Sequence, residues 1–201
     1  DRVADLESGM DLEMPSSFGM RDAEIVKAVR CGRLPEAVLD RAVTRILRIV
    51  QRYLDGRNPD AVFDRDADHE LAREIASQCM VLLKNEGSLL PLAAGTKVAV
   101  IGDFAKNPRY QGAGSSMVNS TQVDVLLDKL IDSELNVIGY QQGFDRHGKP
   151  DAALQKSACE LAAQANTVIL CMGLDEIAES EGLDRSNLRL AQNQVDLLQA
   201  V

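Results

Sequence analysis

Residues 97–102 read Lys97-Val98-Ala99-Val100-Ile101-Gly102 and decide the fold of the second half of this 201-residue chain. The run is continuously apolar and has the length of a strand. Such a pattern is typical of a strand buried on both faces, as in parallel sheets covered by helices. The stretch therefore predicts a buried central strand.

After this strand, helix and strand patterns alternate along the chain. The predicted elements are, in order, helix 122–131, strand 135–140, helix 152–165, strand 167–172 and a helix that begins at residue 193. This alternation predicts an α/β fold with a mainly parallel sheet. Ligands of such sheets bind beyond the carboxyl ends of the strands, which here means the loops 102–121 and 173–188.

Before residue 97 the patterns are mainly helical. The predicted elements are a short strand at 8–15, a helix from Asp22 to a stop at Gly32, a longer helix from Pro35 through Leu54, a helix from His69 to Met80 and an extended stretch at 81–92. Four arginines of the longer helix are spaced as on the solvent face of an amphipathic helix: Arg41, Arg45, Arg48 and Arg52. Residues 56–68 are the predicted linker, because Gly-Arg-Asn-Pro-Asp breaks both helix and strand.

Composition excludes several classes of function. The formal net charge is −9 and the 22 Lys and Arg residues form no cluster, so we expect no nucleic-acid partner. The four cysteines are far apart, without metal-ligand spacing, so we expect no metal and read them as free thiols that favour the cytoplasm. No apolar run reaches the roughly 20 residues of a membrane span. Because the chain starts with Asp1 rather than Met, we expect its natural N-terminus to be missing.

An acidic segment follows the last predicted strand: Glu179-Ser180-Glu181-Gly182-Leu183-Asp184-Arg185. Two carboxylates two residues apart, beside a glycine that frees the backbone, can hold an acid close to a ligand. The alternative is a solvated loop with a surface ion pair between Arg185 and one of the carboxylates, which contributes little.

The other candidate loop contains Asn107-Pro108-Arg109-Tyr110-Gln111-Gly112-Ala113-Gly114-Ser115-Ser116. Its small residues let the backbone approach a ligand closely. The glycines do not fit the dinucleotide pattern GxGxxG, and no lysine follows them as in a phosphate-binding P-loop. A flexible surface loop and a nucleotide-binding loop both remain as alternatives.

Several segments form an ordered set of specific motifs. They are Gly9-Met10-Asp11-Leu12-Glu13-Met14-Pro15, Ala28 to Leu34 with Leu39 to Leu47, Val81 to Glu86 with Leu89 to Leu92, Val98 to Gly102 with Gln111 to Ser116, and Glu179 to Arg185. In this order they resemble the glycoside hydrolases of family 3, the β-glucosidase group. The resemblance covers nearly the whole chain.

The resemblance implies a two-domain enzyme without a cofactor. A helical remnant of a (β/α)8-like barrel at 1–55 would be followed by the linker 56–68 and by part of an α/β sandwich at 69–201. Its reaction would be hydrolysis of terminal, non-reducing β-D-glucosyl residues with retention of configuration. The expected partner is a β-linked saccharide or an aryl β-glycoside.

The resemblance also implies roles for single residues. The catalytic acid/base maps to Glu181, with Glu179 as its rival, and we predict that Arg109, Ser115, Ser116 and Glu179 bind substrate. The Ser-Asp-Trp segment with the family's nucleophile is absent, as expected for an inactive internal fragment. The alternative is a non-catalytic binding or structural module. We expect an exposed Glu181 that titrates near the ordinary value of about 4.3, and an Arg185 that anchors its loop through Asp184 or backbone carbonyls.

Overall fold

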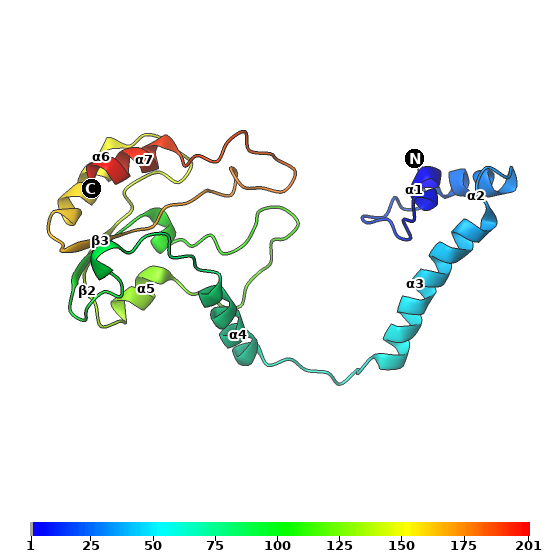
Figure 1. Ribbon diagram of the computed structural model, residues 1–201, viewed down its shortest axis with the longest axis horizontal. Helices are drawn as coiled ribbons and strands as arrows, with labels where there is room; N and C mark the ends of the chain where they lie inside the picture. Colours follow the sequence, from blue (N-terminus) through cyan, green and yellow to red (C-terminus); the bar gives the residue numbers. More distant parts are fainter. Residues whose placement is uncertain (1) are drawn as a thin grey trace. The chain divides into compact units, whose positions relative to one another are not determined.

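The computed structural model describes residues 2–201, so Asp1, the first residue of the predicted barrel segment, lies outside the described residues. The chain forms two compact units that meet in sequence between Val81 and Leu82. Each unit is described by itself, and Figure 1 shows the elements of both.

The second unit is built on a three-stranded parallel sheet. The strands are β1 (Lys97–Ile101), β2 (Asn136–Gln141) and β3 (Thr167–Leu170), in the order β2-β1-β3. Within these strands β1 pairs with both neighbours in parallel, as the buried apolar run predicts. The predicted α/β fold with a parallel sheet is confirmed.

Helices cover both faces of β1, as the ribbon of Figure 1 shows. These helices are α5 (Leu126–Ile131), α6 (Ala152–Ala162) and α7 (Gln192–Ala200). On one face Ile101 packs against Ala158 of α6 and Leu197 of α7, and on the other Val100 packs against Leu127 of α5. Residues 98–101 are consequently 0% exposed. Helix α5 begins later than predicted, because Val125 is still extended.

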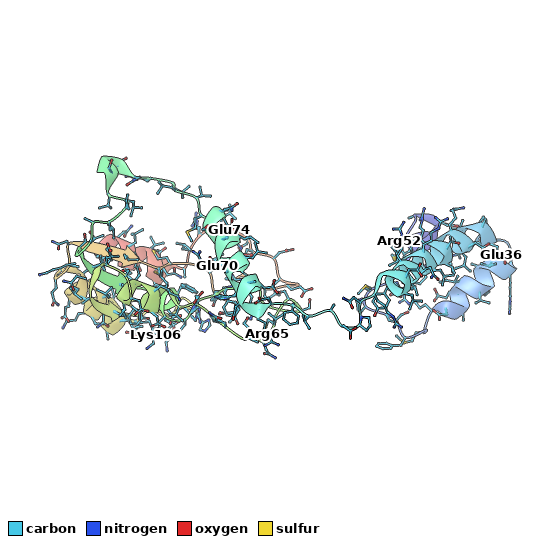
Figure 2. All side chains as sticks on the ribbon, turned by 90° about the horizontal axis from the view of Figure 1, so that it is seen from below. Glu36, Arg52, Arg65, Glu70, Glu74 and Lys106 are labelled. Atoms are coloured by element: carbon cyan, nitrogen blue, oxygen red, sulfur yellow. The ribbon has the colours of Figure 1, made fainter. Side chains whose placement is uncertain are left out.

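The carboxyl end of β1 lies very close to the end of β3. Gly102 has φ +119°, and a Cβ atom there would lie 2.1 Å from the carbonyl oxygen of Cys171. Only glycine fits this position without displacing the backbone of the neighbouring chain segment. The turn continues as a short 3-10 helix, η2 (Asp103–Ala105), and Figure 2 labels Lys106 just after it. Its ammonium group lies 6.0 Å from the ring centroid of Tyr140 in β2.

The first unit is helical. Its helices are α1 (Arg2–Glu7), α2 (Asp22–Arg30), α3 (Glu36–Gly56) and α4 (Arg65–Gln78). Val3, Ala28 and Leu34 form a small core that joins α1, α2 and the start of α3. Residues 57–64 form no helix or strand and are exposed. Figure 2 labels Glu36 and Arg52 on α3, and Arg65, Glu70 and Glu74 on α4.

Three further predicted elements differ from the structure. Residues 8–15 form a loop instead of a strand, because the described sheet offers this segment no partner. Residues 81–92 are irregular and contain the 3-10 helix η1 (Glu86–Ser88). Helix α4 begins at Arg65, before the predicted His69, because the Asp64 carboxylate accepts hydrogen bonds from the N–H groups of Asp66 and Ala67.

Candidate functional site

The two loops that follow β1 and β3 meet beyond the sheet. Ala113 and Ser180 form an isolated parallel bridge. The Glu181 N–H donates to the Ala113 carbonyl oxygen at 3.0 Å. The structure therefore joins loop 102–121, the glycine-rich loop, to loop 173–188, the acidic loop. This is expected for loops at the same edge of a parallel sheet.

Ser115 contacts the Glu181 carboxylate with two donors. Its backbone N–H donates to Oε2 at 2.7 Å, and its hydroxyl donates to the same oxygen. The hydroxyl and then the N–H hold the pKa of Glu181 below its ordinary value, because both bonds favour the charged form. Glu181 is exposed, as predicted, but the expectation of an ordinary pKa is wrong because it did not include Ser115.

Gly114 makes this contact possible. Its φ is +107°, and a Cβ atom at this position would lie 2.6 Å from the Cβ atom of Glu181. Both the backbone conformation and the space available therefore require glycine. Gly114 is therefore a point of close approach between the two loops.

Two arginines contact Glu179, the other candidate for the catalytic acid. Arg109 donates from Nη2 to the Glu179 carbonyl oxygen at 2.8 Å, although the two residues lie 70 positions apart. Arg185 places Nε 3.4 Å from Glu179 Oε1. The expected anchoring of the loop by Arg185 therefore occurs through the Glu179 carboxylate, and the proposed contact with Asp184 or a backbone carbonyl is wrong.

A shallow open hollow lies over this junction and has a volume of about 380 Å³. It is lined by Arg109, Gly112, Ala113, Ser115, Ser116, Glu179, Ser180 and Glu181. The volume lies near the lower end of the roughly 300–1,000 Å³ of small-molecule sites. All five residues predicted to act in catalysis or substrate binding thus line one hollow, and their roles remain predictions.

A polar cluster that joins the starts of both loops to the segment after β2 was not predicted. Arg146, which follows β2, places Nε 3.1 Å from Asp103 Oδ2 and donates to the Asn107 carbonyl oxygen. His147 Nδ1 lies 2.6 Å from Oδ2 of the buried Asp175. The only available signal in the sequence was the placement of Asp103, Arg146 and Asp175 shortly after three successive strands.

Asp175 lies near the start of the acidic loop, and both oxygens of its carboxylate have partners. Its Oδ1 accepts a hydrogen bond from the Ala178 N–H at 2.7 Å. Burial opposes ionisation, but the bond from Ala178 and the contact with His147 outweigh it, so the pKa of Asp175 is below its ordinary value of 3.8. The base of the loop that carries Glu181 is therefore held by the loop's own backbone and by His147 from the segment after β2.

The remaining chemical features of the described residues suggest no further site. Within 2–201 no group of three or more potential metal ligands comes together, and no helix is long and apolar enough to cross a bilayer. All four cysteines are free. Cys159 and Cys171 are partly buried, and burial raises the pKa of the Cys171 thiol.

Comparison with known proteins identifies relatives of the whole chain. The sequence model described as "Glycosyl hydrolase family 3 C-terminal domain" matches residues 80–201. Thermostable beta-glucosidase B of Acetivibrio thermocellus is 40% identical over 100% of the chain, which covers 27% of that protein. An exo-alpha-(1->6)-L-arabinopyranosidase of Bifidobacterium breve is also 40% identical over 100% of the chain, which covers 28% of it.

A solved structure supports the same relationship. The crystal structure of the Bifidobacterium adolescentis GH3 beta-glucosidase superposes with a TM-score of 0.88 at 42% identity. The match covers 100% of the chain and 29% of that enzyme. The chain therefore spans between a quarter and a third of the length of each of these three proteins.

Proposed function

The chain belongs to family 3 of the glycoside hydrolases, and on this premise we propose that it supplies the proton-transferring carboxyl group of a retaining β-glucosidase. Glu181 is that group. The observation that carries the proposal is the position of its carboxylate, exposed in a hollow and anchored through a single oxygen by Ser115. Glu179 is less suitable, because its carboxylate is paired with Arg185 and its carbonyl with Arg109.

The proposed reaction is a double displacement at the anomeric carbon. A nucleophilic carboxylate from outside these 201 residues attacks that carbon while Glu181 protonates the glycosidic oxygen, which leaves with the aglycone. Glu181, now a carboxylate, removes a proton from water, whose oxygen displaces the enzyme carboxylate and releases the sugar. Retention requires the two carboxyl groups to lie about 5–5.5 Å apart.

The lowered pKa of Glu181 places a condition on the first step. Without substrate the group is held in its charged form, which is the form needed for the second step. A neighbouring nucleophilic carboxylate and the exclusion of water by a bound sugar both raise a carboxyl pKa. We propose that these two effects together raise the pKa of Glu181 in the substrate complex, so that its carboxylate takes up a proton from water before the first step.

The substrate contacts are assigned to the rim of the hollow. Arg109, Ser115, Ser116 and Glu179 offer the hydrogen-bond donors and acceptors that sugar hydroxyls require. We propose a terminal β-D-glucoside, whether saccharide or aryl glycoside, from the glucosidase relatives. A relative of equal identity is named for an arabinopyranoside, so this part of the protein does not by itself set the sugar.

The proposed architecture follows the family. Residues 1–55 would belong to the end of a barrel domain, 56–68 to a linker and 69–201 to an α/β sandwich domain. Catalysis would then need both domains and no cofactor, and the 201 residues alone would be inactive.

The test is an assay of the longer protein that contains this chain, using aryl β-glucosides. Glu181→Ala should lower kcat by about 10²–10⁴-fold, the range expected when general acid/base catalysis is removed. Added azide should restore turnover and yield a β-glycosyl azide, because azide needs no general base to attack the glycosyl–enzyme. Glu179→Ala is the matched control and should not respond to azide. Unchanged activity of Glu181→Ala would remove the proposed role.

A further inference from the structure

The two carboxylate oxygens of Glu181 have different surroundings. Oε2 accepts two hydrogen bonds, from the N–H and from the hydroxyl of Ser115. Among the described residues no donor reaches Oε1 of Glu181, a residue that lines the hollow. One oxygen is therefore anchored and the other is free.

This asymmetry bears on where a proton can reside. If the proton were on Oε2, the Ser115 hydroxyl would have to turn and accept it, and the hydrogen bond that this hydroxyl donates to the carboxylate would be lost. A proton on Oε1 leaves both bonds from Ser115 intact. We infer, on the basis of the proposed function, that Ser115 is a positioning residue that anchors Oε2 and makes Oε1 the atom that gives up and takes back the proton.

Several features of the two loops bring Ser115 into contact with the Glu181 carboxylate. The bridge between Ala113 and Ser180 sets the register, so that the residue after each of them faces the other loop. Gly114 leaves space for the Glu181 side chain, and the next residue, Ser115, supplies two donors to one atom. The backbone N–H and the hydroxyl together orient the carboxylate, so that loss of the hydroxyl would leave it held by one hydrogen bond.

The other charged residues that line the hollow, Arg109 and Glu179, have partners other than the Glu181 carboxylate. Arg109, on the glycine-rich loop, donates to the Glu179 carbonyl oxygen. Glu179, on the acidic loop, faces Arg185. Ser115 thus contributes the hydrogen bonds that orient the Glu181 carboxylate, and it acts on a substrate through Glu181 in addition to any contact of its own.

The experiment is an NMR titration of the Glu181 carboxyl carbon in the 201-residue chain. Ser115→Ala removes the hydroxyl donor and should raise the pKa of Glu181 toward the ordinary carboxyl value. Ser115→Thr keeps a hydroxyl and should retain the lower pKa. Ser116→Ala, which alters a neighbouring serine of the same hollow, is the matched control and should leave it unchanged. An identical titration of Glu181 in wild type and Ser115→Ala would overturn the inference.

A second measurement uses the longer active protein. With Ser115→Ala the basic limb of the kcat/KM profile should move to higher pH, because that limb reports the acid of the free enzyme. We expect kcat to fall by about tenfold, as for a partly misplaced catalytic group, with a smaller change in KM. Ser115→Thr should restore both values.

The outcomes separate this inference from the proposed function. If Glu181→Ala reduces activity but Ser115→Ala leaves the pH profile and kcat unchanged, Ser115 does not position the proton. If Glu181→Ala leaves activity unchanged, the proposed function is wrong, and the titration alone then decides whether Ser115 anchors Oε2.

Discussion

Strand β1 and helix α3 both have a regular apolar sequence pattern, yet their apolar side chains differ in how much of their surface is exposed. Residues 98–101 of β1 are 0% exposed, whereas Leu47 of α3 is 59% exposed. The apolar run of β1 is covered by α5, α6 and α7 within its own unit. On α3, Val38 packs on the small core and Ala42 is buried, whereas Leu47, Val50 and Leu54 are exposed. An apolar sequence pattern thus predicts that one face of a helix or strand is apolar. It does not predict which element covers that face.

The polar groups of the two units show the same difference. In the second unit Asp103, Asp175 and Gln194 are buried and each has a partner. In the first unit the pair formed by Arg73 and Glu70 is exposed on both sides. Buried polar contacts orient their neighbours and are costly to break, whereas exposed ion pairs contribute little. The candidate site lies in the unit that contains these three buried polar residues.

The largest expected effect tests the difference between β1 and α3 directly. Ile101→Ala should reduce the free energy of unfolding of the second unit by about 2–5 kcal/mol, because it leaves a cavity beside α6 and α7. The matched change Leu47→Ala should alter stability by about 0.5 kcal/mol or less, as for an exposed position. Urea unfolding followed by circular dichroism and amide hydrogen exchange would measure both. Equal losses would contradict the comparison.

A smaller effect should separate two glycines of the site loops. Gly114 and Gly182 both have positive φ, so alanine at either should cost about 1–2 kcal/mol through backbone strain. Only at Gly114 would the new Cβ atom collide with Glu181, since nothing lies within 4 Å of the corresponding position at Gly182. Gly114→Ala should therefore also abolish the hydrogen bond from the Ser115 N–H.

The readout for this pair is the amide chemical shift and hydrogen-exchange rate of Ser115. We expect a large change in Gly114→Ala and a small one in Gly182→Ala. Similar spectra for the two variants would show that the close approach of the loops is not needed to hold Glu181.

The smallest effect concerns pH. The folded-state pKa of Asp175 is lowered, so its stabilising contribution is present above its unfolded pKa and is lost as the pH falls through the folded value, below 3.8. His147→Ala should raise the pKa of Asp175 and move this loss to higher pH. Acid unfolding of the second unit, compared between wild type and the variant, measures the shift. Coincident curves would show that His147 does not stabilise the acidic loop.

Much of the second unit could be predicted because its signals are local. The run 97–102 predicts a buried strand, and its alternation with helices leads to a parallel sheet with two loops at one edge. Less of the first unit could be predicted. Residues 8–15 have the pattern of a strand but no partner, and a strand forms only when a neighbour satisfies its backbone groups.

The sequence by itself determined the order of helices and strands after residue 96, the family and five of the residues that line the hollow, because periodicity and motif spacing are properties of neighbouring residues. Only the tertiary structure decided which partner each side chain has. Ser115 and Glu181 lie 66 positions apart, and Arg109 and Glu179 lie 70 apart. Such contacts exist because the pairing of β1 with β3 brings the carboxyl ends of the two strands together. The lowered pKa of Glu181 follows from one of these contacts, which no local pattern encodes.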